Sequence, residues 1–178
     1  MLKCGNSKMH PQKSIRFVGC FSFNFVTNNF MESFIKKIDI RWSDLDPNFH
    51  LRHSVYYDFG AYSRICFLQE VGLTPALMVR HSIGPVLFRE ECSFKKEIHF
   101  GDAVSIDLQL EKSTTNFSRW TMKHRIFRDA TILCATIIID GAWIDTKLRK
   151  LTAIPEAFSI KAIDMIPKTE NFILSGNK

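Results

Sequence analysis

The sequence predicts an α+β domain in which one curved antiparallel sheet wraps around a single long helix. A strand-like alternation comes first, one long apolar helical stretch follows it, and a series of strand patterns with short turns follows the helix. This order folds most economically as a sheet layer packed on a helix. The chain has 178 residues, of which 46% are hydrophobic, and this suffices for the core of one domain.

The first strand is predicted where apolar and charged residues begin to alternate. From Phe34 the pattern becomes regular, and Ile38, Ile40 and Trp42 are separated by charged residues, which is the period of a half-buried strand. The strand is expected to end at residues 43–48, where proline and asparagine favour a turn.

A long helix is predicted between Ser54 and Gly72. The Ser54 hydroxyl can cap the helix by accepting from a free amide of the first turn, and Gly72 supplies a C-terminal stop. Gly60 and Ala61 lie in its middle, where glycine lowers helix propensity. Because such small residues allow close approach to another backbone, we expect this helix to lie tightly against the sheet.

Strand patterns then dominate to about Ile144. They are expected over residues 86–94, 104–111, 120–126 and 131–144. Short turns separate the last three, which predicts an antiparallel meander. Residues 155–163 are expected to form a short helix.

We expect the domain to span residues 34–165, with an N-terminal extension at 1–33 and a C-terminal tail at 166–178. The extension starts with basic residues, lacks acidic residues up to Phe30 and contains an apolar stretch at 17–26, as a signal peptide does. However, Asn24 interrupts that stretch and no small-residue cleavage site follows it. Alternatively, Met31 begins the domain, and the residues before it are an appendage or follow a misread upstream start. We favour an appendage outside the fold.

Composition excludes several classes of function. Lys and Arg number 24 against 18 Asp and Glu, a mild basic excess that suits phosphates, but no basic run typical of a nucleic-acid arm occurs. The five cysteines form no C-x-x-C pair, which indicates neither disulfides nor a zinc site. No apolar run is long enough to cross a bilayer. We expect a cytoplasmic protein without a metal or cofactor.

The densest group of reactive residues lies at 41–57. It holds the pattern R-x-x-D-x-D-P, and His53 follows seven positions after Asp46. This segment resembles the hotdog-fold acyl-CoA thioesterases of the 4-hydroxybenzoyl-CoA thioesterase type. The resemblance runs from Phe34 to Phe158 and includes Tyr56, Leu68-x-x-Val71-Gly72, Phe100-Gly101-Asp102 and Leu151-x-x-Ile154-Pro155.

The resemblance implies a hotdog fold, a substrate that is an acyl-CoA or acyl-carrier thioester, and a homodimer or homotetramer with shared active sites. It implies that Asp46 is the catalytic carboxylate and that the backbone amide of His53 polarises the thioester carbonyl. Two departures stand out. Asn48-Phe49-His50 replaces the glycine and small residues usual in the family, and Trp42 replaces a tyrosine found in one branch.

This chemistry fits the residue types. Negative charge develops on the carbonyl oxygen, and unpaired amides at a helix N-terminus are suitable donors for it. The Asp46 carboxylate can attack the carbonyl directly or activate a water, and both routes stay open. Asp44 is expected to brace the loop or pair with Arg41.

Further substrate contacts are expected from other side chains. Arg52, Ser54, Tyr56 and Glu90 are predicted to bind substrate, Glu90 because it interrupts an apolar strand face where an unpaired carboxylate is costly. Tyr56 and Tyr57 are expected to pack in the core or line an acyl tunnel. Candidates for the phosphates of coenzyme A are Arg52, Arg89, Lys95, Lys96 and Arg119.

Two alternatives use the same fold. In the first, Asp46 and His50 act as the acid and base of an enoyl-CoA hydratase. In the second, the altered loop at Asn48-Phe49 makes the protein a non-catalytic module that binds an acyl-CoA or an acyl carrier.

Overall fold

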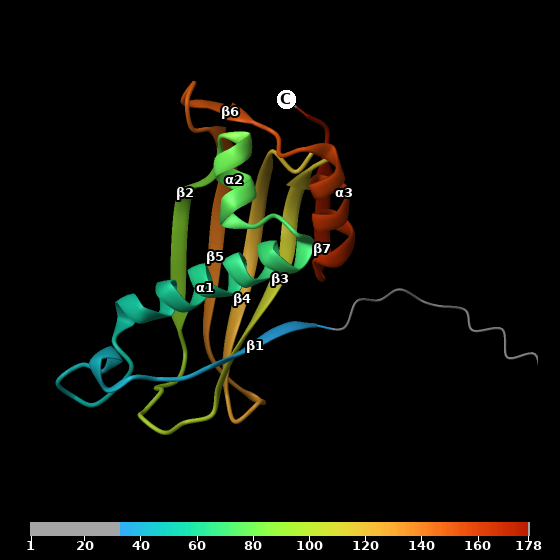
Figure 1. Cartoon of the computed structure of the whole chain (residues 1–178). Helices are drawn as coiled ribbons and strands as arrows, with labels where there is room; N and C mark the ends of the chain where they lie inside the picture. Colours follow the sequence, from blue (N-terminus) through green and yellow to red (C-terminus); the bar gives the residue numbers. More distant parts are fainter. Residues whose placement is uncertain (1–32, 178) are drawn as a thin grey trace, which may run out of the picture.

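A curled, largely antiparallel sheet forms the body of the computed structural model, which describes residues 33–177 (Figure 1). Five strands follow the order β1-β3-β4-β5-β2, β6 pairs with β5, and β7 pairs with β3 in parallel. The strands are β1 (Phe34–Ile38), β2 (Ile83–Phe94), β3 (Val104–Thr114), β4 (Arg119–Arg128), β5 (Ile132–Asp145), β6 (Lys150–Thr152) and β7 (Lys168–Ser175). The predicted α+β class and the β3-β4-β5 meander are confirmed.

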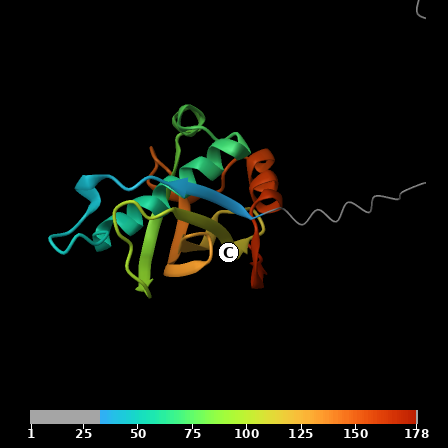
Figure 2. The same ribbon diagram turned by 90° about the horizontal axis from the view of Figure 1, so that it is seen from below.

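Helix α1 (His53–Val71) lies across one face of the curled sheet (Figures 1 and 2). The helix lies close to the sheet at Gly60, where an added Cβ atom would lie 3.2 Å from Arg64 Nη1, 3.4 Å from the His124 ring of β4 and 3.6 Å from Ile137 of β5. Two shorter helices, α2 (Pro75–His81) and α3 (Glu156–Met165), accompany α1. No helix among residues 33–177 is long and apolar enough to cross a membrane.

The first strand is shorter than predicted. It ends at Ile38, which pairs with Val104 at the start of β3, so the chain beyond it has no strand to pair with there. Trp42 instead begins the short 3-10 helix η1 (Trp42–Asp44) and its side chain is exposed. The predicted continuation of the strand from Ile38 to Trp42 is therefore wrong.

The helix start also differs from the prediction at one residue. Arg52 occupies the N-cap position of α1 with extended backbone, and no side chain caps the helix. Ser54 is the second helical residue, so the predicted Ser54 cap is wrong. The C-terminal stop is confirmed, since Gly72 is left-handed at φ 96° and its amide donates to Leu68 and Gln69 carbonyls.

The chain after Ile154 adds two elements to the sheet edge. Helix α3 confirms the short helix predicted at residues 155–163, within two residues at each end. Strand β7 lies in residues 166–178, which were expected to form a tail. The register of β7 places Ile173 beside Lys112 and Leu174 beside Ser113 of β3. Residues 1–32, and with them nearly all of the predicted N-terminal extension, lie outside the described residues.

Strand β2 forms an open edge of the sheet. Its only strand partner among the described residues is β5, and a bulge between Leu87 and Arg89 interrupts their register. The bulge breaks the predicted alternation at Phe88, whose side chain is 58% exposed. A long edge with exposed apolar side chains is a surface that proteins normally cover by pairing.

A partly buried polar network lies between α1 and the sheet. Arg64 of α1 places Nη1 and Nη2 each 3.3 Å from Glu90 Oε1, and Nη1 lies 3.4 Å from His124 Nε2. His124 Nδ1 lies 2.7 Å from the Asp107 carbonyl oxygen. Because a carbonyl only accepts, the proton sits on Nδ1, and Nε2 is left to accept from Arg64. The network thus holds His124 neutral.

This neutral histidine predicts acid sensitivity. Burial, together with the Arg64 charge, lowers the pKa of fully buried His124 from 6.5 to about 3. The unfolded chain therefore binds a proton below pH 6.5 that the folded protein does not, so stability is complete above that pH and falls as the pH drops toward 3. Between pH 7 and 5 we expect this residue to remove about 2 kcal/mol from the free energy of unfolding.

Urea titrations at pH 7 and pH 5 measure this loss, with His124→Gln as the non-titrating comparison. The variant is expected to start from lower stability at pH 7 and to lose less than the wild type on acidification. An equal loss in both proteins would show that another group causes the acid sensitivity.

Candidate active site

Asp46 is held in a tight loop between η1 and α1. Its Oδ1 atom accepts from the backbone amides of Asn48 at 2.8 Å and His50 at 3.1 Å. The Asp46 amide donates to the His50 carbonyl at 2.8 Å, and Leu45 and Leu51 form an antiparallel bridge across the loop. The turn predicted at residues 43–48 is therefore present, and Asp46 helps to form it. Its Oδ2 atom accepts no hydrogen bond from the described residues, so one carboxylate oxygen remains available.

Asp44 has a structural role, as predicted. Its side chain is 2% exposed and accepts from the Arg41 amide at 2.9 Å and from Arg41 Nη2 at 2.8 Å. Hydrogen bonding from Arg41 lowers the pKa of Asp44 below its usual range, which keeps the carboxylate ionised. The Asp44 carbonyl also accepts from the Arg52 amide at 2.9 Å. Asp44 therefore ties the start of the loop to the start of α1.

The first turn of α1 presents free backbone donors. Its first hydrogen-bonded amide is that of Val55, which donates to the Arg52 carbonyl at 3.0 Å. Among the described residues, no acceptor bonds the amides of His53 and Ser54. Such amides carry the positive end of the helix dipole and suit a developing negative charge.

Asp46 and His53 line the same open cleft of about 730 Å³. Tyr56 also lines it, as do Lys95 and Lys96, two of the five phosphate candidates. The other lining residues are His50, Leu51, Phe94, Glu97, Ile98, His99 and Arg128. The cleft thus lies between the 46–56 segment and the chain that leaves β2. The two segments are tied by the Leu51 amide, which donates to the Ile98 carbonyl at 2.8 Å.

Other predicted site residues lie elsewhere. Arg52 and Ser54 are exposed and do not line the cleft. Glu90 pairs with Arg64, beneath α1 rather than beside Asp46, which explains how a carboxylate is tolerated on that strand. Arg89, another phosphate candidate, forms an ion pair with Asp140 and does not line the cleft.

Tyr56 forms the floor of the cleft. It is buried, and its ring packs edge-on against Phe94 with centroids 5.0 Å apart. Burial raises the pKa of Tyr56 to about 12, so its hydroxyl stays protonated at neutral pH. Tyr57 is partly buried and packs against the core instead.

Positive charge gathers along the cleft. The Lys95 and Lys96 amides both donate to the Cys134 carbonyl, at 2.7 and 3.1 Å, which anchors their turn to β5. Neither lysine forms an ion pair with another described residue. Arg128, which sequence reasoning missed, donates from Nη1 to the Glu97 carbonyl at 3.0 Å.

The loop departs from the family pattern at a specific backbone position. Phe49 has φ 63°, the left-handed region that glycine occupies without cost. Its ring lies 5.9 Å from that of Trp42, which in turn lies 6.2 Å from Phe100. The loop therefore keeps a glycine-like conformation, and an exposed aromatic group surrounds it.

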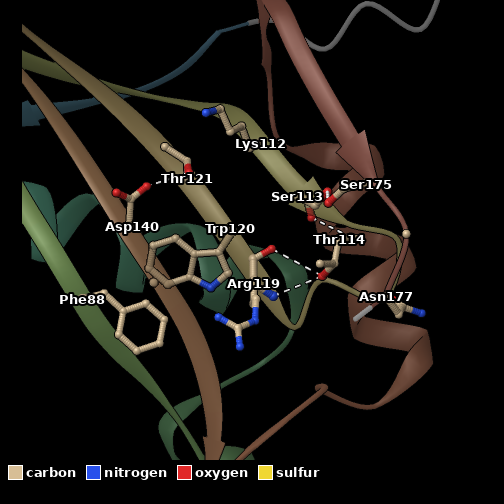
Figure 3. Close-up of a pocket in the computed structure, with 12 residues that line it drawn as sticks. Phe88, Lys112, Ser113, Thr114, Arg119, Trp120, Thr121, Asp140, Ser175 and Asn177 are labelled. Carbon is tan, nitrogen blue, oxygen red and sulfur yellow. Dashed lines mark hydrogen bonds between the residues drawn. The ribbon is translucent and has the colours of Figure 1, made fainter.

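A second cavity of about 760 Å³ lies at the other end of the sheet (Figure 3). Phe88, Trp120 and Asp140 line one side, and Ser113, Ser175 and Asn177 line the side near β7. It contains Arg119, the remaining phosphate candidate, but neither Asp46 nor His53. The predicted catalytic residues are thus all in the first cleft.

Solved structures share this fold. A hypothetical protein from Staphylococcus aureus, solved in complex with CoA, superimposes with a TM-score of 0.71 at 17% identity, over 76% of this chain and 85% of that one. DHNA-CoA thioesterase from S. aureus gives 0.62 at 21%, over 68% and 80%. A thioesterase from Thermus thermophilus, complexed with coenzyme A and Zn, gives 0.63 at 20%, over 77% and 96%. No curated protein matches the chain.

These likenesses show that the fold is a hotdog fold. Residues 40–161 match the sequence model of the thioesterase-like superfamily, and the chain belongs to that family of thioester hydrolases. The predicted family is thereby confirmed. The match includes the loop at Asp46, helix α1 and the meander.

Proposed function

We propose that this protein is an acyl-CoA thioesterase that hydrolyses a thioester to a free acid and CoA. The observation that carries the proposal is the placement of Asp46 and the first residue of α1 along one cleft. The superfamily supports thioester hydrolysis, and two fold neighbours were solved with CoA bound.

In the proposed reaction Asp46 is the nucleophile or the general base. Oδ1 is fixed by the Asn48 and His50 amides, which orients the carboxylate and leaves Oδ2 for the reaction. Direct attack by Oδ2 forms an anhydride and releases the CoA thiolate, which takes up a proton; water then hydrolyses the anhydride. Alternatively, Oδ2 takes a proton from a water that attacks the carbonyl carbon, and the tetrahedral intermediate then breaks its C–S bond and releases the CoA thiolate, which takes up a proton.

The amides of His53 and Ser54 are proposed to stabilise the oxyanion. Both are free of other described acceptors, and fixed amides need no reorganisation as charge develops. The backbone of His53 supplies this interaction, so its imidazole is not required for it. Tyr56 is proposed to contact the acyl group at the cleft floor.

Coenzyme A is proposed to lie along the basic side of the cleft. Lys95 and Lys96 project from an anchored turn without ion-pair partners among the described residues. Arg128 lies beside them, and Asp102 and Asp129 partly offset its charge. Their charges suit the phosphates of a CoA ester. Arg52, Ser54 and Glu90 do not line this cleft. We propose that they bind substrate only if a second subunit completes the site.

A homodimer is proposed through β2. Its edge is long and carries exposed Leu87 and Phe88, and antiparallel pairing with a second copy would close it. Sedimentation velocity is expected to give twice the mass of one chain. Phe88→Asp is expected to shift the protein to monomer, and a wild-type monomer at micromolar concentration would rule the dimer out.

Thiol release from a panel of acyl-CoAs tests the proposed function. The panel varies chain length and includes aryl esters and crotonyl-CoA, and free thiol is followed with a chromogenic reagent. We expect turnover of at least one ester. Hydration of crotonyl-CoA without thiol release would favour the hydratase, and tight binding without turnover would favour a binding module.

A further inference from the structure

Two histidines and a glutamate meet at the mouth of the cleft. The ligand atoms of His50, Glu97 and His99 lie within 4.8 Å of one another. Glu97 Oε2 lies 3.6 Å from His50 Nε2 and 3.7 Å from His99 Nε2. We propose that these three side chains bind a divalent transition metal ion of the zinc class.

The spacing fits such an ion. Zinc bonds to imidazole nitrogen and carboxylate oxygen are about 2.0–2.2 Å long, so tetrahedral ligands stand about 3.4 Å apart. The two distances to Glu97 exceed this by a few tenths of an ångström, and all three ligand atoms lie within 4.8 Å of one another, so side-chain rotations must bring them together around the ion. The His50 and His99 rings are edge-to-face at 89°, with centroids 4.8 Å apart.

The backbone presents these ligands as one unit. His50 and His99 are direct partners in an antiparallel bridge, and the adjacent Leu51 amide donates to the Ile98 carbonyl. The His50 amide also donates to Asp46 Oδ1. Little ordering of the backbone is therefore needed when the ion binds.

Asp102 contacts His99 on the side of the ring that carries Nδ1. Its Oδ2 atom accepts from the His99 amide at 2.7 Å and lies 3.8 Å from His99 Nδ1. A carboxylate beside the second nitrogen of a metal-binding histidine fixes the ring and leaves Nε2 free for the metal. Arg128 Nη1 lies 3.6 Å from the same Oδ2, so Asp102 offsets the charge of that guanidinium beside the site.

Three protein ligands leave a coordination position for water or another small ligand. All three residues line the cleft, so that position is reached from it. The absence of a C-x-x-C pair says nothing about this site, because its ligands are histidine and glutamate. The sequence did not indicate it because His50 lies far from Glu97 and His99 along the chain. The inference rests on ligand geometry and stands whether or not the protein hydrolyses thioesters.

Calorimetric titration of the full, chelator-treated chain with Zn²⁺ tests the site. We expect a Kd in the micromolar range or below. His99→Ala is expected to weaken binding by about 100-fold or more, and Asp102→Asn by about 10–100-fold. His81→Ala, which removes an exposed histidine outside the cleft, is the matched control and should leave the Kd unchanged.

Imidazole nitrogen NMR of the wild type provides a second readout that needs no variant. On Zn²⁺ addition, the Nε2 signals of His50 and His99 should shift together at one equivalent while those of His81 stay fixed. Unmoved His50 and His99 signals, or equal Kd values for the wild type and a folded His99→Ala variant, would overturn the proposal.

Discussion

Asp46→Asn is expected to lower kcat for the best acyl-CoA substrate by about 10²–10⁴-fold, the usual range for loss of a general base. Asparagine keeps an oxygen that can accept from the Asn48 and His50 amides, so the loop should retain its shape. It removes the negative charge and the basic oxygen. The effect should therefore fall on kcat, with KM nearly constant.

Asp39→Asn is the matched control, because Asp39 is an exposed carboxylate before the same loop and does not line the cleft. It should keep wild-type rates. Thermal unfolding of both variants checks that the fold is intact. Wild-type kcat in folded Asp46→Asn protein would remove Asp46 from the reaction.

His53→Pro is expected to have the second largest effect, a loss of about 10²–10³-fold in kcat, as when one oxyanion donor is removed. Proline lacks the amide proton but is tolerated at the first helical position, which His53 occupies. The preceding residue also suits proline, since Arg52 has φ −61° and ψ 134°. The change therefore deletes a donor without breaking α1.

His53→Ala is the informative partner, because it keeps the amide and removes the imidazole. If the backbone is the oxyanion donor, His53→Ala should stay within a few-fold of wild type while His53→Pro loses activity. Equal losses in the two variants would assign the role to the imidazole instead. Steady-state kinetics and circular dichroism of both variants give the comparison.

Local patterns predicted the parts of the fold whose signals are local. Strand β3 alternates apolar and polar residues and packs as its pattern indicated, and Gly72 ends α1 in the left-handed conformation. The Ser54 cap failed because a hydroxyl near a helix start does not fix which residue is the N-cap. Helix α2 was missed although Thr74 caps it and Pro75 begins it.

Features that depend on distant segments were harder to predict. Strand β7 has no clear alternation, and its place is set by pairing with β3 some sixty residues earlier. Glu90 forms an ion pair with Arg64 of α1, and the alternation of residues along a strand does not reveal such a partner. On the second wall of the cleft, Lys95 and Lys96 were predicted as phosphate candidates. His99 was missed for the same reason as Glu90, because it reaches His50 only through a long-range bridge.

A crystal structure with a non-hydrolysable acyl-CoA ketone analogue would show whether Asp46 and the start of α1 act on one carbonyl group. We expect the analogue carbonyl oxygen to lie about 2.7–3.1 Å from the His53 or Ser54 amide, with Asp46 Oδ2 facing the carbonyl carbon. An analogue bound instead in the cavity lined by Phe88 and Trp120, with its carbonyl far from Asp46, would contradict it.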